Sequence, residues 1–522
     1  MWTPTAKRVY YLGKSVPFLA RHAGIHVWRW FPVMTHPKKA VLPGFLSLLV
    51  VICALSPHAS ASWKERVLYS FQGVPDGSLP VGGIVFDSAG NLYGATTEGG
   101  SSSCISVAQC GTVYQLAPPA RQGGPWTETV LYVFKGNASQ DGASPAGGLV
   151  MDSAGNLYGT TAYGGTGNCV LLGTLMGCGT VYEMSPPKQK GGKWTETVLY
   201  SFPTAKKGYL PNGDLVFDSA GNLYGATQYG GGHGTTCNGF YQYCGAVFEL
   251  SPPKTKGGKW TEKVLHGFSS GTDGAAPNGG LVLDGKGNVY GTTFGGGNES
   301  RDCGAGGCGT AFELTPPTKK GDAWTEKHLH VFADGSDGAE PAGNLIFDAK
   351  GSLYGTALGG NPSGGGIAFQ LRAINGGRWK ETVLHWFSNN GPGAFTTGLI
   401  FDSSGNLYGP TNEGALFRGT VVRLKRPAKQ GESWVPTILY TSGEVRTVQA
   451  PPPSCFSIRR ATFTAQRRTG DLGRRVKAVA GRSMRSCRRN LGTRNLGTDG
   501  TFPGFWRRKI RERPVCPRIS VR

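Results

Sequence analysis

The segment at 86–96, Phe-Asp-Ser-Ala-Gly-Asn-Leu-Tyr-Gly-Ala-Thr, recurs with small changes along most of this 522-residue chain. The copies are marked by their aspartates, which are Asp87, Asp152, Asp218, Asp284, Asp348 and Asp402. The period is about 65 residues and shortens to about 54 before the last copy. A fixed period of this kind indicates a repeat architecture, because each unit has to pack against its neighbours to bury its apolar face.

The residue pattern of one repeat, at 126–187, predicts four short strands and shows no helical periodicity. These strands are expected at 126–134, 148–152, 157–161 and 179–184. The first is headed by Trp126 and is so rich in β-branched and aromatic residues that burial on both faces is expected. The second and third form a hairpin whose tight turn contains Gly155. Two prolines, Pro186 and Pro187, end the fourth strand.

Four short antiparallel strands per unit predict an all-β fold, a β-propeller of about six four-stranded blades over residues 62–441. We name the hairpin strands a and b, the following strand c and the tryptophan-headed strand d. There are six a–b hairpins but seven tryptophan-headed segments, which begin at Trp63, Trp126, Trp194, Trp260, Trp324, Trp379 and Trp434. The extra segment either closes the ring or belongs to an incomplete seventh blade. An open β-solenoid or a string of sandwiches is the alternative, since common propeller repeats are only about 40–50 residues long.

The charge is unevenly distributed along the chain. Of the formal net charge of +22, residues 1–62 contribute +7 and residues 442–522 contribute +16, which leaves −1 for residues 63–441. The repeats therefore lack the basic stripe that nucleic-acid binding requires, and no nucleic-acid partner is expected. Residues 442–522 are Arg-rich and carry no repeat, so they predict a disordered or frameshifted tail; a polybasic arm is the alternative.

An export signal is predicted at 34–61. Lys38 and Lys39 precede an apolar run at 41–55, and Ala59-Ser60-Ala61 supplies a small-residue cleavage site. Cleavage before Ser62 would leave no transmembrane span in the mature protein, although a membrane anchor is the alternative reading of the apolar run. Residues 1–33 resemble neither signal nor fold and are interpreted as a mis-called extension. We expect the protein to be secreted or held in the cell envelope, as a monomer.

Cysteines recur in pairs in the b–c loops of four consecutive repeats. The pairs are Cys104/Cys110, Cys169/Cys178, Cys237/Cys244 and Cys303/Cys308. In an exported protein, one pair per loop predicts four local disulfides. Zinc sites built from the pairs of different blades are the alternative.

Candidate ligand residues lie in loops that should share one end of the propeller. The acidic candidates, Asp76, Asp141, Asp273 and Asp337, each precede a glycine in a d–a loop. They predict Ca²⁺ or ligand contacts, or simple Asp-Gly turns. The aromatic candidates are Tyr163, Tyr229 and Phe294, which either stack on sugar rings or pack their own loops. The aspartates of the a–b turns present the same choice between calcium and turn chemistry.

The repeated Asp-Ser-Ala-Gly-Asn-Leu-Tyr-Gly-Thr-Thr core and the Cys-Gly-Thr-Val-Tyr-Glu-Met-Ser-Pro-Pro strand at 178–187 resemble the choice-of-anchor tandem repeat proteins with GloVer-type repeats of bacterial envelopes and secretomes. The resemblance covers about residues 63–441 and implies export and a C-terminal anchor that varies. It implies no activity and no catalytic residues. The chain departs from the family after Tyr440, where another a–b hairpin should follow.

Sequence motifs of catalysis are missing. The nine histidines form no ligand-spaced cluster, and the chain contains no Gly-x-Ser-x-Gly elbow, His-Glu-x-x-His or phosphate loop. The sequence therefore favours a binding or scaffold module for an envelope or extracellular polysaccharide or protein, without a cofactor. The alternative is an extracellular carbohydrate-active hydrolase or lyase with its site on the loop-rich face. Two carboxylates near the central axis would favour the enzyme, and a glycine-lined face would favour binding.

Overall fold

The computed structural model describes residue 63, residues 65–441 with gaps, and the backbone of 458–459 and 462–463. The gaps are 102–109, 137–139, 172–173, 190, 232–243, 256, 298–302, 304–305, 361–363, 389–397, 412–418 and 430. The chain divides into two units, 1–473 and 474–522, and only the first contains described residues. The predicted N-terminal extension, the export signal and nearly all of the tail lie outside the described residues.

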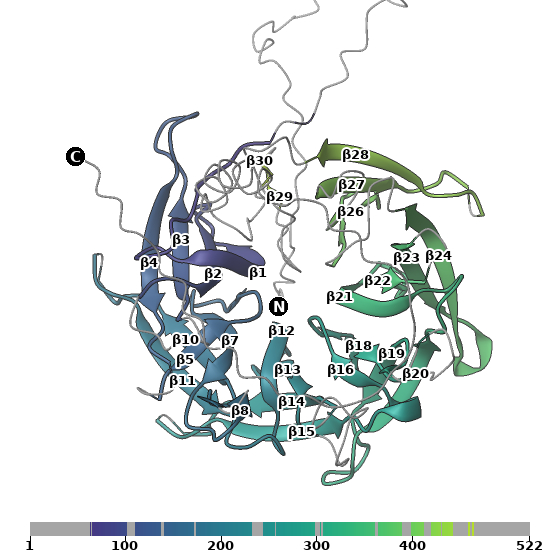
Figure 1. Ribbon diagram of the computed structural model, residues 1–522, viewed down its shortest axis with the longest axis horizontal. Coiled ribbons are helices and arrows are strands. Elements are labelled where there is room, and N and C mark those ends of the chain that lie inside the picture. Colours follow the sequence, from purple (N-terminus) through teal and green to yellow (C-terminus); the bar gives the residue numbers. More distant parts are fainter. Residues whose placement is uncertain are drawn as a thin grey trace, which may run out of the picture. The chain divides into compact units, whose positions relative to one another are not determined.

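Six antiparallel sheets, which we number as blades 1 to 6, are arranged around a common centre (Figure 1). Blade 1 contains β1 (Ser78–Phe86), β2 (Leu92–Glu98), β3 (Thr112–Ala117) and β4 (Thr127–Val133). Blade 2 contains β5 (Gly142–Pro145), β6 (Val150–Met151), β7 (Leu157–Gly164), β10 (Thr180–Ser185) and β11 (Thr195–Ser201). Blade 3 contains β12 (Tyr209–Phe217), β13 (Leu223–Tyr229), β14 (Ala246–Ser251) and β15 (Thr261–Gly267).

The second half of the ring repeats this arrangement. Blade 4 contains β16 (Ala275–Pro277), β17 (Val282–Leu283), β18 (Val289–Gly295), β19 (Thr310–Thr315) and β20 (Thr325–Val331). Blade 5 contains β21 (Ala339–Phe347), β22 (Leu353–Gly359), β23 (Gly364–Ala373) and β24 (Trp379–Ser388). Blade 6 contains β25 (Ile400–Phe401), β26 (Leu407–Thr411), β27 (Thr420–Lys425) and β28 (Val435–Thr441). Strand a lies nearest the centre and strand d at the rim (Figure 1), so the predicted all-β propeller is confirmed.

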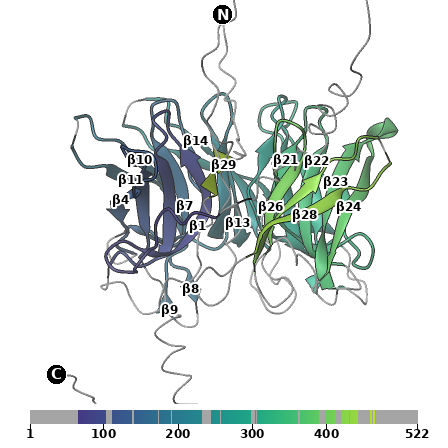
Figure 2. The same ribbon diagram turned by 90° about the horizontal axis from the view of Figure 1, so that it is seen from above.

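Short elements complete the described part. Strands β8 (Val170–Leu171) and β9 (Thr174–Leu175) form a hairpin in the b–c loop of blade 2, at one end of the ring (Figure 2). Strands β29 (Ile458–Arg459) and β30 (Thr462–Phe463) pair with each other. Two 3₁₀ turns, η2 (Gly271–Asp273) and η4 (Asn375–Gly377), lie in loops. Among these described residues, none forms a helix of the length and apolarity that a membrane crossing requires.

Each a–b hairpin is closed by the aspartate of the repeated motif. In blade 2, Asp152 Oδ1 accepts hydrogen bonds from the amides of Ala154 (2.8 Å) and Asn156 (2.9 Å). Its Oδ2 accepts one from the Tyr158 hydroxyl at 3.1 Å. Gly155 takes φ 86°, a conformation that costs glycine little. The six turn aspartates therefore act in turn chemistry, which is the reading the local sequence favours.

Aromatic side chains connect neighbouring blades. Phe134, which follows β4, is fully buried and packs edge to face on Tyr182 of β10, with ring centroids 5.0 Å apart. Phe202 repeats this contact with Phe248 in the next blade, at 5.3 Å. Edge-to-face pairs of this kind add to the free energy gained by burial. The core is thus a chain of contacts between adjacent blades, as expected for a closed array of repeats.

The prediction that strand d is buried on both faces is wrong. In β4 the side chains of Thr127 and Thr129 are exposed, whereas Glu128 and Val130 are partly buried. This strand is the outermost of its sheet, so no further strand covers its outer side. The alternation of exposed and buried residues is that of a half-buried edge strand.

The segment that begins at Trp63 occupies the place of a seventh strand d. Trp63 packs against Tyr408 and Leu439 of blade 6, whereas Phe71 packs on Tyr114 of blade 1 with ring centroids 4.7 Å apart. Residues 65–72 form no ladder in the described part of the chain. The sector between β28 and β1–β4 accordingly holds none of the six blades (Figure 1). Six complete blades are therefore joined by the outer segment of a seventh position.

Candidate functional site

The b–c and d–a loops meet at one end of the ring, which we call the loop-rich end. The amide of Gly165 in the b–c loop of blade 2 donates to the carbonyl oxygen of Asp141 in the d–a loop at 2.7 Å. The same bond occurs in three more blades, from Gly100 to Gly73 (3.0 Å), from Gly231 to Ala205 (2.9 Å) and from Gly297 to Gly271 (2.6 Å). Antiparallel topology and these bonds place the two sets of loops together, as the sequence predicts.

Disulfides brace the b–c loops at this end. Cys169 is bonded to Cys178 and Cys303 to Cys308, with Cα atoms 5.0 Å and 5.1 Å apart. Cys110 and Cys244 are also disulfide-bonded, and their predicted partners, Cys104 and Cys237, lie outside the described residues. Both described pairs are local, as predicted.

The four candidate aspartates of the d–a loops all accept a hydrogen bond from a side chain of the preceding segment d. These pairs are Tyr69 with Asp76 (2.7 Å), Tyr132 with Asp141 (2.8 Å), His266 with Asp273 (3.0 Å) and His330 with Asp337 (3.1 Å). Asp141 is only 6% exposed, and it also accepts the amides of Lys135 and Gly142. These contacts favour the turn interpretation for Asp141, because its oxygens are engaged within the loop.

Two of the three candidate aromatic residues belong to one cluster. Tyr229 in β13 lies opposite Tyr209 in β12, with ring centroids 6.1 Å apart. The pKa of Tyr209 is raised to about 12, mainly by burial and to a smaller extent by electrostatic interaction with Tyr163 and Tyr229. Tyr163 of blade 2 therefore lies near Tyr209. The Tyr209 hydroxyl is buried and has no hydrogen-bond partner among the described residues. We call Tyr163, Tyr209 and Tyr229 the tyrosine cluster.

Tyr209 escaped the sequence analysis, although it stands next to the only d–a loop with Lys207-Gly208 in place of Asp-Gly. Phe294 does not join the cluster. In blade 4, Gly295 pairs with Ala275, and this pair is equivalent to Tyr229 and Tyr209 in blade 3. Phe294 precedes this position by one residue. Because side chains alternate along a strand, Phe294 lies on the opposite face of its sheet.

A glutamate from the next segment d approaches each of the four aspartate loops and also the loop that carries Lys207. These five glutamates each stand two residues after a tryptophan: Glu128, Glu196, Glu262, Glu326 and Glu381. Glu262 Oε2 accepts a hydrogen bond from Lys207 Nζ at 3.0 Å, where lysine replaces the aspartate. The result is a polar layer between blades, built from a tyrosine or histidine, a loop residue and a glutamate.

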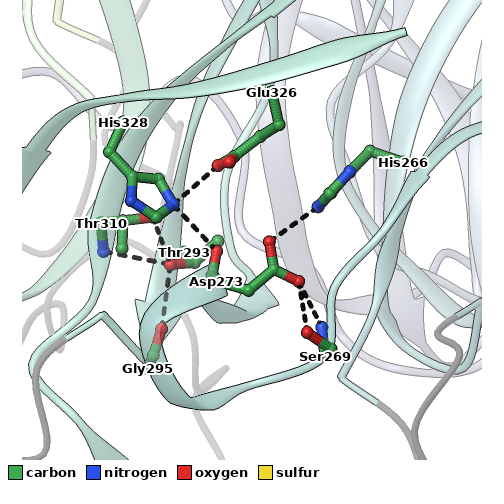
Figure 3. Close-up of polar contacts among 8 residues, drawn as sticks. All are labelled: His266, Ser269, Asp273, Thr293, Gly295, Thr310, Glu326 and His328. Atoms are coloured by element: carbon green, nitrogen blue, oxygen red, sulfur yellow. Dashed lines mark hydrogen bonds and ion pairs between the residues drawn. The ribbon is translucent and has the colours of Figure 1, made fainter. Parts of the chain in front are cut away.

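The junction between blades 3 and 4 brings four ionisable groups of this layer together, His266, Asp273, Glu326 and His328 (Figure 3). His266 comes from β15, Asp273 from η2 and Glu326 from β20; one ligand atom of each lies within 4.8 Å of the others. The Nε2 atom of His328 is 2.9 Å from Glu326 Oε1 and 3.3 Å from the Asp273 carbonyl oxygen. Each of these four side chains is 15% to 26% exposed. Among the described residues, this is the group that could hold a metal ion.

Hydrogen bonds favour the charged forms of Asp273 and His328 at this junction. Burial raises the pKa of Asp273, but hydrogen bonds from His266 and Ser269 outweigh it, and the net shift is downward. A hydrogen bond to Glu326 raises the pKa of His328 against the opposing effect of burial. The carboxylate of Asp273 is therefore ionised at neutral pH and is available as a cation ligand.

The central axis is lined mainly by glycine. The innermost strand of every blade has an equivalent position four residues before the turn aspartate. The residues at this position are Gly83, Gly148, Asp214, Gly280, Asn344 and Gly398. Asp214 accepts the amide of Gly148 at 2.5 Å and the side-chain amide of Asn344 at 2.8 Å, so blades 2, 3 and 5 are linked across the centre. A Cβ atom added to Gly147 would overlap the backbone of Gly213. Among these six equivalent residues, only Asp214 carries a carboxylate, which is already hydrogen-bonded.

Fold and site together define a repeat propeller with a disulfide-braced loop-rich end and a polar layer between blades. The chain belongs to the Gloeobacter/Verrucomicrobia repeat family, whose model matches residues 52–235 and 232–447. The family resemblance inferred from the repeated motifs is thereby confirmed. A search of curated proteins returned no match.

Several solved structures are similar to this chain in fold. A luciferin-regenerating enzyme has 14% identity and a TM-score of 0.38, with 69% of this chain and 96% of that chain covered. An ulvan lyase, a polysaccharide lyase, has 11% identity and a TM-score of 0.42, with coverages of 72% and 86%. A protein of unknown function from Dyadobacter fermentans has 12% identity and a TM-score of 0.38, with coverages of 71% and 96%. At such identities and scores the comparisons carry no functional argument.

Proposed function

We propose that this chain is a secreted or cell-envelope repeat protein that binds extracellular polysaccharide at its loop-rich end. The observation that carries the proposal is the tyrosine cluster, which brings Tyr163, Tyr209 and Tyr229 together across blades 2 and 3. Partly exposed aromatic rings offer apolar faces with polar edges, which suit the faces and hydroxyl groups of sugars. The near-zero charge of the repeats favours a neutral polymer over a polyanion.

A binding role is favoured over a glycosidase by the composition of the axis. Hydrolysis of a glycosidic bond ordinarily uses two carboxylates that flank the bond. The axial residues of the six strands a include one carboxylate, Asp214, which is held by Gly148 and Asn344. The catalytic alternative therefore requires a site elsewhere at the loop-rich end.

The test is a glycan array probed with the exported protein, in which bound glycans are also checked for cleavage products. Tyr209→Ala is the matched variant, because alanine occupies the equivalent position in three other blades, as Ala143, Ala275 and Ala339. We expect the variant to fold normally and to bind the selected glycan about 3- to 10-fold more weakly, as the loss of one stacking contact implies. Unchanged affinity would refute the role of the cluster, and product formation would favour the hydrolase or lyase.

A further inference from the structure

One histidine interrupts a position that is apolar in every other repeat. In six of the seven segments d, the residue four positions after the tryptophan is apolar. These residues are Val67, Val130, Val198, Val264, Val383 and Ile438. The same position in β20 is His328. The exchange of a β-branched apolar residue for histidine at one repeat only is a local change in chemistry that the fold itself does not require.

A second histidine substitution meets the first at the same junction. The position six residues after the tryptophan is tyrosine in four segments d and histidine in three. The tyrosines are Tyr69, Tyr132, Tyr200 and Tyr440, and the histidines are His266, His330 and His385. Between blades 3 and 4, His266 faces Asp273 and Glu326, and His328 lies beside that glutamate (Figure 3). Of the described junctions, this one alone combines two histidines with two carboxylates.

We propose that this junction binds a divalent transition metal of the Zn²⁺ class, with His266 Nε2, the Asp273 carboxylate and the Glu326 carboxylate as ligands. Imidazole with carboxylate oxygen is a common zinc donor set. Bonds of about 2.0–2.2 Å in tetrahedral geometry hold ligand atoms about 3.3–3.6 Å apart. The three donors here already lie within 4.8 Å of one another, and His266 Nε2 is 3.0 Å from Asp273 Oδ1. Small side-chain movements would complete the site.

The imidazole ligand favours a metal of the Zn²⁺ class over calcium. Ca²⁺ takes six to eight oxygen ligands, and the junction offers two carboxylates together with imidazole nitrogens. Three protein ligands leave one tetrahedral position open for water or an external donor. Because His266 belongs to β15 and Glu326 to β20, the ion would also cross-link blade 3 to blade 4.

His328 acts as a positioning residue in this proposal. Its Nε2 atom is 2.9 Å from Glu326 Oε1, so the ring fixes the carboxylate beside the Asp273 loop. Groups that orient a ligand in this way typically change metal affinity by about 10- to 100-fold when they are removed. His266, as a ligand, should matter more than His328.

The experiment titrates ZnCl₂ into the chelator-treated full-length protein by calorimetry and follows the melting temperature. The repeats themselves supply the variants: His266→Tyr and His328→Val introduce residues that the equivalent positions already hold, and His330→Tyr is the control at the next junction. We expect one saturable site in the wild type and in His330→Tyr, with a melting temperature that rises on zinc addition. We expect no saturable binding in His266→Tyr and about 10- to 100-fold weaker binding in His328→Val.

Two results would overturn the proposal. The first is wild-type protein that binds no zinc saturably, or that binds it without a rise in melting temperature. The second is His266→Tyr with wild-type affinity, which would place the ion elsewhere, for example on histidines outside this junction. Circular dichroism of each metal-free variant shows whether it is folded, so that a folding defect is not mistaken for a lost site.

Discussion

At the scale of single residues, one side-chain type serves two purposes in this chain. Asp152 and its five counterparts each accept the backbone amide four residues ahead, and five of the six also accept the amide two residues ahead, so their role is set by local sequence. Asp273 also accepts a hydrogen bond from the amide of Ser269 within its own loop, at 2.6 Å. It meets Glu326 only because blade 4 packs against blade 3. A turn aspartate can thus become part of a site through tertiary contacts.

The glutamates of the polar layer predict a pH dependence of stability. Burial is the largest cause that raises the pKa of Glu128, Glu196 and Glu381 from 4.5 to about 7. Because folding favours their protonated forms, this contribution is complete below about pH 4.5 and is lost as the pH rises through about 7. We expect the urea midpoint of unfolding to fall as the pH rises from about 4.5 through about 7. The triple variant Glu128→Gln, Glu196→Gln, Glu381→Gln should show a shallower decline, and an identical decline would contradict the assignment.

At the scale of elements, each blade is specified by turns and register more than by strand propensity. β7 pairs with β10 from Leu157 opposite Met184 to Thr161 opposite Thr180, and the two threonine hydroxyls share a buried hydrogen bond of 2.8 Å. Beyond Gly164 the b–c loop leaves the sheet of the blade, and the disulfide between Cys169 and Cys178 closes it around the short β8–β9 hairpin. The loop is therefore held by covalent closure at one end of a regular sheet.

Removal of the disulfide of blade 2 should destabilise the protein measurably. In the loop-entropy model, the bond between Cys169 and Cys178, nine residues apart, contributes about 2–3 kcal/mol. We expect the double variant Cys169→Ala, Cys178→Ala to lower the free energy of unfolding by about that amount, as measured by urea denaturation. Wild-type protein under reducing conditions provides the comparison. A loss well below 1 kcal/mol would show that the loop is restrained by its hydrogen bonds.

At the scale of the whole molecule, the two ends of the repeat array meet through residues 63–72. The Tyr440 hydroxyl of β28 donates to Glu65 Oε2 at 2.8 Å, across 375 residues of sequence. The contact repeats the one between Tyr200 and Glu262 in consecutive blades. Phe71 is only partly buried, whereas Phe134 and its other counterparts are fully buried. Within the described residues, the segment 63–72 thus contacts both blade 6 and blade 1.

Trp63→Ala should therefore loosen blade 6 selectively. Trp63 packs on Tyr408 as Trp194 packs on Tyr93, and Trp-to-Ala changes in cores cost about 3–5 kcal/mol. We expect hydrogen exchange to accelerate in β26–β28 and to stay unchanged in β13–β15. Trp194→Ala is the matched control, which should affect blades 1 and 2 instead. Uniform acceleration around the ring would show that closure is a property of the whole array.

The sequence alone determined the repeat, the class of fold and the local chemistry. Hairpin turns, strand order and the disulfide pairs Cys169–Cys178 and Cys303–Cys308 all depend on residues close together in the chain, so periodicity and turn chemistry suffice to predict them. The exposure of Thr127 and Thr129 in β4 was not predicted. It depends on which strand lies at the rim, and the composition of the strand does not encode that place.

Only the tertiary structure decided which residues form a site. Tyr209 joins Tyr163, and His266 meets Glu326, across neighbouring blades. The comparison of repeats marks His328 as an exception in the sequence, but only the structure places it beside the Asp273 loop of the preceding blade. Asp214 and Asn344 meet across the axis although 130 residues separate them. The physical reason is that radial packing brings residues from different positions of separate repeats together. The neighbours of a residue that differs between repeats therefore depend on this packing and cannot be predicted from the local sequence.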